Sequence, residues 1–367
     1  MSLNQHVSGQ LFGYSTLPET NGPWGILLPR PGDKSEQSTP DAQDVVKEIT
    51  ADHLSFDVSQ SVSDRGFLFI TFSLATAVAI WFLGMWLQLP ATHPEADPLA
   101  EMIGTAVIGT LAAISSFTAY RSARKPLPPP VYISRTLRKV LAWQEKTKSW
   151  LALDYDSVVP VTFPYRMITT SGSATLYALT LHQLKPGTRE VEHAITPTAL
   201  RGTPEECRAN WEFIRGYMDG KPEDLPPIRL VPSTQNPKAW MARTDRTVFG
   251  GLIDGEHRIN PKHLLFGNFV VYFWGMVSYW GERAAGWIER TAPRAPLPDW
   301  LPKVSASEPG TSPYKVIPPT PTQLQAQEGT LPHLRRRWLI CGVLSTALWG
   351  FMFGSLFARL WLLGLYN

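Results

Sequence analysis

The sequence has little charge and almost no cysteine. Charged residues make up 18% of the 367 residues, and Cys207 and Cys341 are the two cysteines. Two cysteines are too few for a disulfide framework or a cysteine-based zinc site. The net charge of +3 is too small to favour nucleic-acid binding, so we expect no nucleic-acid partner. Globular proteins carry about 25% charged residues. The shortfall, together with 14 tryptophans, indicates a chain that lies partly in a bilayer.

Three long apolar segments account for the missing charge. Residues 66–89, 102–120 and 338–358 contain no Asp, Glu, Lys or Arg. At about 1.5 Å per residue, a helix over each segment is close to or longer than the hydrocarbon core of about 30 Å. The segments are apolar on every face, whereas the helices of soluble proteins are amphipathic. We therefore expect a transmembrane hairpin within 66–120 and a third transmembrane helix over 338–358.

The distribution of basic residues predicts the orientation of these helices. The link between the first two segments holds Glu95, Asp97 and Glu101 but no Lys or Arg. Basic residues instead follow the second segment and precede the third: Arg121, Arg124, Lys125, Arg335, Arg336 and Arg337. Because basic flanks stay in the cytoplasm, we expect a multi-pass protein with residues 121–337 and the N-terminus cytoplasmic. The N-terminal residues lack the pattern of a signal peptide, so the first helix is expected to be an uncleaved anchor.

A fourth apolar stretch, residues 264–281, is harder to place. It is about 18 residues long and rich in Trp and Tyr. Basic residues lie on both sides of it: Arg258, Lys262, Arg283, Arg290 and Arg294. One span cannot keep both flanks inside, so we expect an interfacial or re-entrant helix on the inner leaflet, within a cytoplasmic extension over 221–290. A fourth span and a buried helix of the soluble domain are the alternatives.

Two segments have the composition of poorly folded chain. Residues 1–65 are polar, acidic and rich in turn-forming residues, which predicts a largely flexible cytoplasmic tail. Within this tail, residues 42–54 would place Val45, Val46 and Ile49 on one face of a short amphipathic helix. Residues 291–337 are dense in proline, which predicts an extended linker to the third transmembrane helix.

Residues 131–220 carry the pattern of a folded domain. Short runs of β-branched, aromatic and alternating apolar residues cover 131–144, 150–163, 174–184 and 190–199, and turn-forming residues separate them. Several short strands at this spacing predict an antiparallel meander.

A helix is expected to follow these strands. Thr203 is suited to the N-cap, Pro204 to the first helical position and Glu206 to a capping box, and Gly220 provides a C-terminal stop. The apolar residues at helical spacing fall on one face: Cys207, Trp211, Ile214 and Met218. The predicted fold class is an α+β membrane protein, with transmembrane helices and a small antiparallel-sheet domain capped by a C-terminal helix. That domain resembles a pleckstrin-homology-like module.

The pair of spans followed by VYISRTLRKVLAWQ and WLALDYDSVVPVTF carries a family resemblance. Over about residues 60–290, the chain resembles an uncharacterised family of proteobacterial inner-membrane proteins. Genes of that family often lie beside genes for type VI secretion spikes and effectors. The resemblance implies a bacterial inner-membrane location and a protein partner from the secretion machinery or its effectors. It implies no catalytic residues.

Residues able to do chemistry are scattered. Asp154 and Asp156 form the tightest carboxylate pair; such a pair could hold a metal or act as acid and base, but we interpret it as a solvated pair at a strand end. His182 and His193 lie on neighbouring predicted strands, without a third ligand at metal spacing. The sequence contains no P-loop, G-x-G-x-x-G or H-E-x-x-H motif. We therefore predict no catalytic residue, no metal and no cofactor, and we do not expect an enzyme.

Two sets of residues are predicted to bind. A basic group is suited to a protein partner or to anionic lipid headgroups: Arg135, Arg138, Lys139, Lys146 and Lys148. Charge that only sets topology is the alternative for this group. Gly350 and Gly354 form a G-x-x-x-G pattern suited to helix packing, either within this chain or in a homo-oligomer.

These observations predict a non-catalytic inner-membrane protein that holds a protein partner, or anionic lipid, at the cytoplasmic face. Given the resemblance, we expect a type VI secretion accessory, adaptor or immunity protein. The alternative from another class is a membrane-active secreted effector or a membrane enzyme. The absence of charge inside the first two spans argues against an ion or proton pathway.

Overall fold

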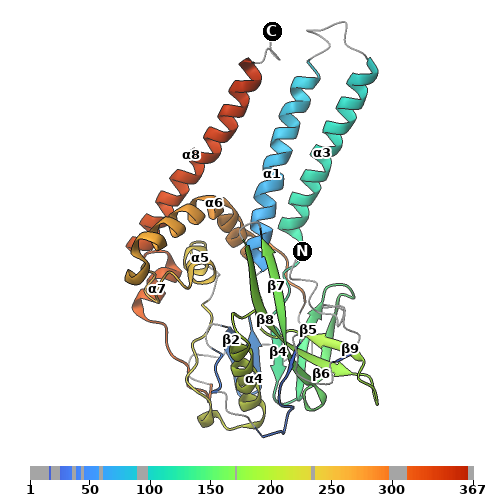
Figure 1. The fold of residues 1–367 in the computed structure, drawn as a ribbon, viewed down its shortest axis with the longest axis vertical. Helices are drawn as coiled ribbons and strands as arrows, with labels where there is room; N and C mark the ends of the chain where they lie inside the picture. Colours follow the sequence, from blue (N-terminus) through green and yellow to red (C-terminus); the bar gives the residue numbers. More distant parts are fainter. Residues whose placement is uncertain are drawn as a thin grey trace. The chain divides into compact units, whose positions relative to one another are not determined.

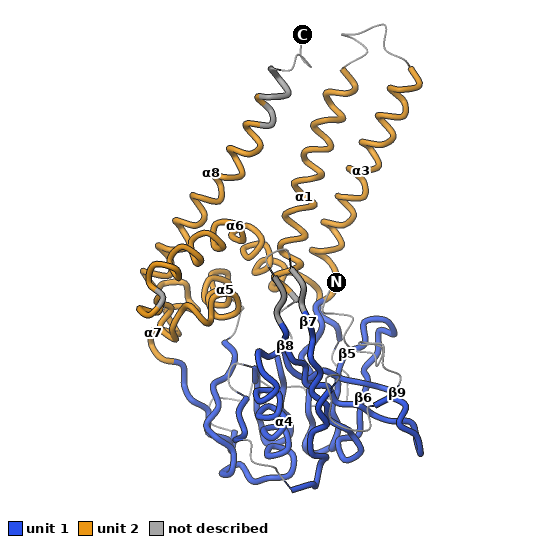
Figure 2. Tube along the Cα trace, viewed as in Figure 1, with its two compact units in different colours: residues 1–61, 127–232, 294–319 blue, residues 62–126, 233–293, 320–367 orange. Residues whose placement is uncertain are grey.

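Figure 1 shows the fold of the chain, and Figure 2 marks the two compact units into which it folds. The computed structural model describes residues 16–17, 25–34, 39–42, 45–57, 61–88, 98–169, 172–232, 236–296 and 312–362. Unit 1 comprises Met1–Ser61, Leu127–Pro232 and Arg294–Pro319. Unit 2 comprises Val62–Pro126, Ser233–Pro293 and Thr320–Asn367. Each unit is assembled from segments that are far apart in the sequence, so its boundaries differ from the continuous domains expected from composition.

Unit 1 contains two antiparallel sheets. The first has five strands in chain order: β2 (Val46–Ile49), β3 (His53–Phe56), β4 (Val131–Ser134), β5 (Lys139–Gln144) and β6 (Ser149–Asp154). The second has four strands in the order β1 (Ile26–Leu27), β7 (Val159–Thr169), β8 (Gly172–Leu184) and β9 (Val191–Ile195). The prediction of antiparallel sheet within residues 131–220 is confirmed.

The prediction of a single strand over 150–163 is wrong, because a 3-10 turn at Tyr155–Ser157 divides this segment. Tyr155 is fully buried, and its Oη donates to Asp219 Oδ2 at 2.7 Å. This contact draws the ring into the core and interrupts the extended backbone. β6 therefore ends in the first sheet and β7 begins in the second.

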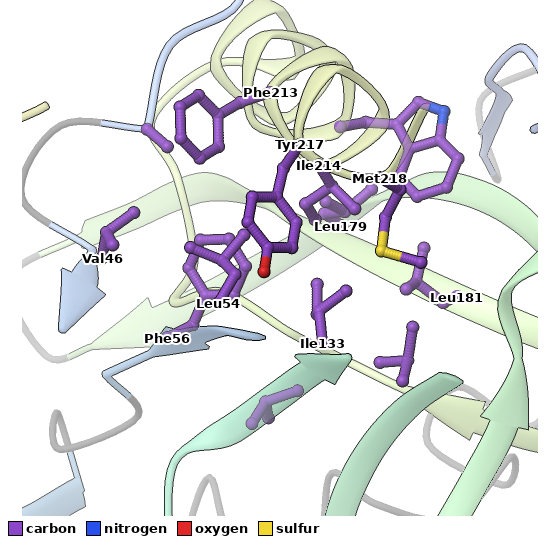
Figure 3. Close-up of a cluster of buried hydrophobic side chains, with 14 of the residues drawn as sticks. Val46, Leu54, Phe56, Ile133, Leu179, Leu181, Phe213, Ile214, Tyr217 and Met218 are labelled. Atoms are coloured by element: carbon purple, nitrogen blue, oxygen red, sulfur yellow. The ribbon is translucent and has the colours of Figure 1, made fainter. Parts of the chain in front are cut away.

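Helix α4 (Pro204–Asp219) packs on both sheets. Its N-cap matches the prediction, because Thr203 Oγ1 accepts the Glu206 backbone N–H at 3.3 Å and Pro204 lies in the first turn. The predicted capping box is wrong, because Glu206 Oε2 accepts the Gly202 N–H at 3.2 Å instead of the Thr203 N–H. The predicted apolar face is buried: Cys207, Trp211, Ile214 and Met218. Figure 3 shows the inward side of this helix facing apolar residues of both sheets: Leu54, Phe56, Ile133, Leu179 and Leu181.

The flexible tail expected at the N-terminus is wrong for residues 45–57, and so is the helix expected over 42–54. β2 and β3 form a hairpin, and β3 pairs with β4 from His53↔Ser134 to Phe56↔Val131. Val46, Leu54 and Phe56 are completely buried. Strands this short carry little pattern of their own, so their structure depends on the distant strand β4.

Among its described residues, unit 2 contains three helices long and apolar enough to cross a membrane: α1 (Ser61–Trp86), α3 (Pro98–Arg124) and α8 (Pro332–Leu362). The prediction of helices long and apolar enough to span a membrane is confirmed. The other α-helices described in unit 2 are α5 (Trp240–Phe249), α6 (Leu264–Thr291) and α7 (Pro321–Glu328), and Figure 2 shows them at one end of α1, α3 and α8.

The extended linker expected over 291–337 is wrong for residues 320–337. Thr320 Oγ1 accepts the Gln323 N–H at 3.2 Å, and Gln323 Oε1 accepts the Thr320 N–H at 3.0 Å, so this pair caps α7. Gly329, with a left-handed φ of 67°, ends α7, and Pro332 begins α8. The prolines here stand in the first turns of helices, where a missing N–H costs nothing.

Helix α6 begins at Leu264, as the apolar stretch 264–281 begins, but it continues to Thr291. One face is buried through Gly267, Val271 and Gly275. Large apolar side chains remain exposed in its first half: Leu264, Leu265, Phe266, Phe269, Phe273 and Trp274. Its location at a membrane surface stays a prediction.

Candidate binding surfaces

The basic residues predicted to bind a partner do not form one cluster. Arg135 lies in the turn between β4 and β5, and its side chain is held inside unit 1. Its Nη2 donates to the Gly220 carbonyl oxygen at 2.7 Å, and its Nη1 donates to Tyr314 Oη at 3.0 Å. Arg135 therefore ties the end of α4 to the segment that contains Tyr314.

Arg138, at the end of the same turn, is also a structural cation. Its Nε donates to Asp156 Oδ2 at 2.8 Å and its Nη2 donates to Asp219 Oδ1 at 2.9 Å. The guanidinium lies 5.0 Å from the centre of the Tyr155 ring. The hydrogen bond from Arg138 lowers the pKa of Asp156, and the bond to Asp156 raises the pKa of Arg138. Asp156 is therefore a partner of Arg138 rather than half of a catalytic pair with Asp154.

The three predicted lysines are exposed. Lys139 begins β5 opposite Asp154, whereas Lys146 and Lys148 lie in the turn after the end of β5. The strand separates them by roughly 17 Å, at about 3.4 Å per residue. Lys148 Nζ donates to Glu145 Oε1 at 3.1 Å. The prediction of a single basic cluster is therefore wrong. The exposed turn 145–148, with Lys146 and Lys148, is the part of it that remains a candidate binding surface.

That turn leads into β6, which is the last strand of its sheet. Within the described part of the chain, β6 pairs with β5 alone. Leu151 and Leu153 point into the core, while Ala152 and Asp154 are exposed. A strand with a free edge presents backbone N–H and C=O groups to which an extended peptide can add.

The two histidines considered as a pair lie on opposite faces of their sheet. His182 pairs with Ala194, and His193 pairs with the neighbouring Gln183. Successive side chains of a strand point to opposite faces, so the two rings do not meet. Among the residues that the structure describes, no group of three or more His, Cys, Asp or Glu side chains is arranged to hold a metal ion.

The predicted G-x-x-x-G face of α8 makes no contact within the described chain. A Cβ added at Gly350 or Gly354 would meet nothing within 4 Å. The close approach of α8 to α6 lies elsewhere, where a Cβ on Gly342 would be 2.6 Å from the Tyr279 ring. The prediction that Gly350 and Gly354 pack against this chain's own helices is therefore wrong. Their contact with a second copy of the chain stays a prediction.

Both acidic residues of α6 are turned into the interior of unit 2. Arg243 of α5 donates from Nη2 to Glu282 Oε2 at 3.2 Å and from Nη1 to Glu289. Thr244 Oγ1 adds a hydrogen bond to Glu282 Oε2 at 2.9 Å. All four residues are buried. Both carboxylates of α6 thus face one guanidinium inside the unit rather than the groove side of the helix.

Another face of α6 lines an open groove of about 1250 Å³ within unit 2. Trp280, Arg283, Trp287 and Arg290 recur at spacings of three and four residues, which places them on one helix face. The other walls come from α8, from the start of α5 and from α1, which contributes Phe69 and Ile70.

The groove was not predicted from the sequence, because Arg283 and Arg290 were interpreted only as charges flanking an apolar stretch. The repeat W-x-x-R-x-x-x-W-x-x-R over residues 280–290 was a readable signal of a basic and aromatic helix face. The walls from α1 and α8 had no such signal, since only the tertiary fold brings them to α6.

Comparison of the chain with protein-family models, with curated proteins and with solved structures finds no match. Functional inference therefore rests on two surfaces, the edge strand β6 with its basic turn in unit 1 and the groove in unit 2.

Proposed function

We propose that the chain is a non-catalytic, multi-pass protein of a bacterial inner membrane that presents unit 1 at the cytoplasmic face as a docking module for a protein partner. The connectivity supports this proposal. The α1–α3 hairpin leaves from the end of β3 and returns to β4, and these two strands are paired neighbours. Both ends of the hairpin therefore open on the side of the membrane that holds the sheets.

The charge distribution supports the cytoplasm as that side. Arg121 and Arg124 lie in the last turn of α3, and Arg335, Arg336 and Arg337 lie in the first turns of α8. Glu95 and Asp97 are in the link between α1 and α3, which lacks Lys and Arg. Basic flanks favour the cytoplasm.

The strand order of unit 1 supports a pleckstrin-homology-like module. A meander of β3 to β6 is followed by a second meander of β7 to β9 and then by the helix α4. Such a module is a scaffold for recognition, but its fold alone does not name the ligand.

One observation carries the docking proposal: a sheet edge that is open in the described chain begins beside exposed lysines. An extended segment of a partner can add to β6, where Ala152 and Asp154 are exposed, and acidic residues of that segment can meet Lys146 and Lys148. The family resemblance favours a type VI secretion effector or a component of its machinery as this partner, with the chain as accessory, adaptor or immunity protein.

The first half of α6 supports a membrane-surface location for that helix. Leu265 is 88% exposed, and Phe266 and Phe269 are each 67% exposed. A helix that presents such a face beside transmembrane segments suits the boundary between headgroups and acyl chains. We propose that this half of α6 rests on the inner leaflet.

Photo-crosslinking in cells tests the docking proposal. A benzophenone amino acid at Ala152 should give a discrete adduct with a partner, while the same group at the exposed Thr188, in the β8–β9 turn, should not. The double variant Lys146→Glu, Lys148→Glu should remove the adduct, because it places negative charge beside an acidic segment. The proposal fails if Ala152 gives no discrete adduct or if the charge reversal leaves the adduct unchanged.

A further inference from the structure

The groove of unit 2 carries positive charge without a matching negative charge. Four basic side chains line it: Lys238, Arg283, Arg290 and Arg335. No Asp or Glu is among its lining residues. Lys238, Arg283 and Arg335 are exposed, and none of the four forms an ion pair among the residues that the structure describes. The groove therefore favours a ligand that carries negative charge.

Arg283 and Arg290 are held in place by aromatic and backbone groups rather than by carboxylates. Arg283 lies 5.6 Å from the centre of the Trp280 ring, and its Nη1 is 3.4 Å from Tyr279 Oη. Arg290 Nη1 is 3.4 Å from the Pro237 carbonyl oxygen. These contacts orient the guanidinium groups and leave donors for an anion, and guanidinium groups bind phosphate in a bidentate manner.

The aromatic residues of the groove are those that favour a membrane interface. Trp240 and Trp338 are in contact, with ring centres 4.9 Å apart, and Trp287 lies 5.6 Å from Phe69 of α1. Tryptophan and tyrosine concentrate at the level of lipid headgroups. The groove thus combines cations with aromatic side chains of the kind found at headgroup level.

The remaining walls are the surfaces of membrane-spanning helices. Ile70 of α1 and Leu339, Val343 and Ala347 of α8 line the groove with apolar side chains. A ligand that reaches these walls continues along helices whose other faces are exposed and apolar, so its apolar part lies where acyl chains lie. The volume exceeds the range of about 300–1,000 Å³ that is usual for small-molecule sites.

We propose that this groove binds one anionic phospholipid of the membrane leaflet, with its phosphate among Arg283, Arg290 and Arg335 and an acyl chain along Leu339, Val343 and Ala347. Basic pockets between transmembrane helices are suited to anionic headgroups. The proposal is independent of a partner at β6, because the two surfaces belong to different units and share no residue.

Binding of defined lipids to the purified full-length protein tests this proposal. Native mass spectrometry in non-ionic detergent would follow the titration with phosphatidylglycerol, with phosphatidylcholine as the neutral comparison. We expect one phosphatidylglycerol site at least about tenfold tighter than phosphatidylcholine binding. The triple variant Arg283→Gln, Arg290→Gln, Arg335→Gln should weaken phosphatidylglycerol binding on the order of 100-fold, at roughly fivefold per cation.

A control is the triple variant Arg121→Gln, Arg124→Gln, Arg336→Gln, which removes the same number of exposed charges from α3 and α8, outside the groove lining. It should keep the wild-type affinity within about twofold. The single variant Ala347→Phe keeps all the cations and narrows the apolar part, and it should also weaken phosphatidylglycerol binding. Unchanged thermal unfolding midpoints would show that the variants are folded.

Three results would overturn the proposal. The first is equal affinity for phosphatidylglycerol and phosphatidylcholine. The second is equal loss in the groove variant and in the control variant, which would indicate general charge attraction. The third is displacement of the lipid by equimolar glycerol 3-phosphate together with unchanged binding in Ala347→Phe, which would identify a soluble phosphate ester as the ligand.

Discussion

His182 is a buried titratable residue of unit 1 whose charge state is set by the fold. Its side chain is 6% exposed and stands edge-on to the Phe163 ring, with ring centres 5.5 Å apart. Burial lowers the pKa of His182 to about 4, and hydrogen bonding to the backbone of Val159 and Thr180 offsets only part of this effect. The imidazole is therefore neutral in the folded protein at physiological pH.

The buried His182 predicts that unit 1 loses stability in mild acid. In the unfolded chain His182 takes up a proton below its ordinary pKa of 6.5, whereas the folded chain does so only near pH 4. Stability is therefore complete above pH 6.5 and declines as the pH falls from 6.5 to 4. At pH 5 the free energy of unfolding should be about 2 kcal/mol lower than at pH 7.5, at about 1.4 kcal/mol per pH unit.

Cys207 provides the measurement in a Cys341→Ala background. It is fully buried, and burial raises the pKa of its thiol to about 12, so a brief maleimide pulse after equilibration in urea labels only unfolded unit 1. The variant His182→Gln should flatten the change between pH 7.5 and pH 5. An identical pH dependence in wild type and variant would contradict the assignment.

Helices α6 and α8 pack closely because glycines lie at their contact. A Cβ on Gly275 of α6 would lie 2.7 Å from Cys341 Sγ of α8, and a Cβ on Gly342 of α8 would lie 2.6 Å from the Tyr279 ring. Helix pairs in membranes gain their contact from small residues of this kind. The helix face that carries Arg283 and Arg290 is positioned by this packing.

Substitution at these glycines should separate the two helices. Gly275→Leu forces a side chain into the space of Cys341 and should destabilise unit 2 by about 1–3 kcal/mol, as overpacking typically does. Gly350→Leu is the matched control, because nothing lies within 4 Å of its added Cβ. Maleimide labelling of Cys341 in a Cys207→Ser background should speed up in Gly275→Leu only. Equal labelling rates in the two variants would count against the observed packing.

The whole molecule combines a sheet unit and a helical unit, and the segments of the two units alternate along the chain. The chain enters unit 2 between β3 and β4, again after residue 232, and a third time after residue 319. Because β3 and β4 are hydrogen-bonded neighbours, the two ends of the α1–α3 hairpin are fixed to one sheet. This arrangement predicts that the sheets and the α1–α3 link lie on opposite sides of the membrane.

Reporter fusions test that topology. Alkaline phosphatase needs disulfides that form in the periplasm and not in the cytoplasm. A fusion after Glu95, in the α1–α3 link, should be active, and a fusion after Lys221, which follows α4, should be inactive. Comparable amounts of the two fusion proteins on immunoblots serve as the control. Activity of the Lys221 fusion would reverse the orientation.

The sequence by itself determined the elements whose stabilising pattern is local. The spans follow from uninterrupted apolar runs, and α4 follows from Thr203, Pro204 and a buried face at helical spacing. The presence of antiparallel strands between residues 131 and 195 follows from alternation and turn residues, although the breaks at 135–138 and 155–157 do not. In each case the pattern needed to recognise the element lies within one segment of chain.

The tertiary structure decided what depends on distant partners. β2 and β3 are strands because β3 pairs with the distant strand β4. Arg135 is a structural cation because it donates to the Gly220 carbonyl oxygen, and Arg138 is one because it pairs with Asp156 and Asp219. The groove likewise needs α1 and α8 beside α6. A hydrogen bond or a cavity wall requires two groups at a fixed distance, and their separation along the chain does not specify that distance until the fold closes.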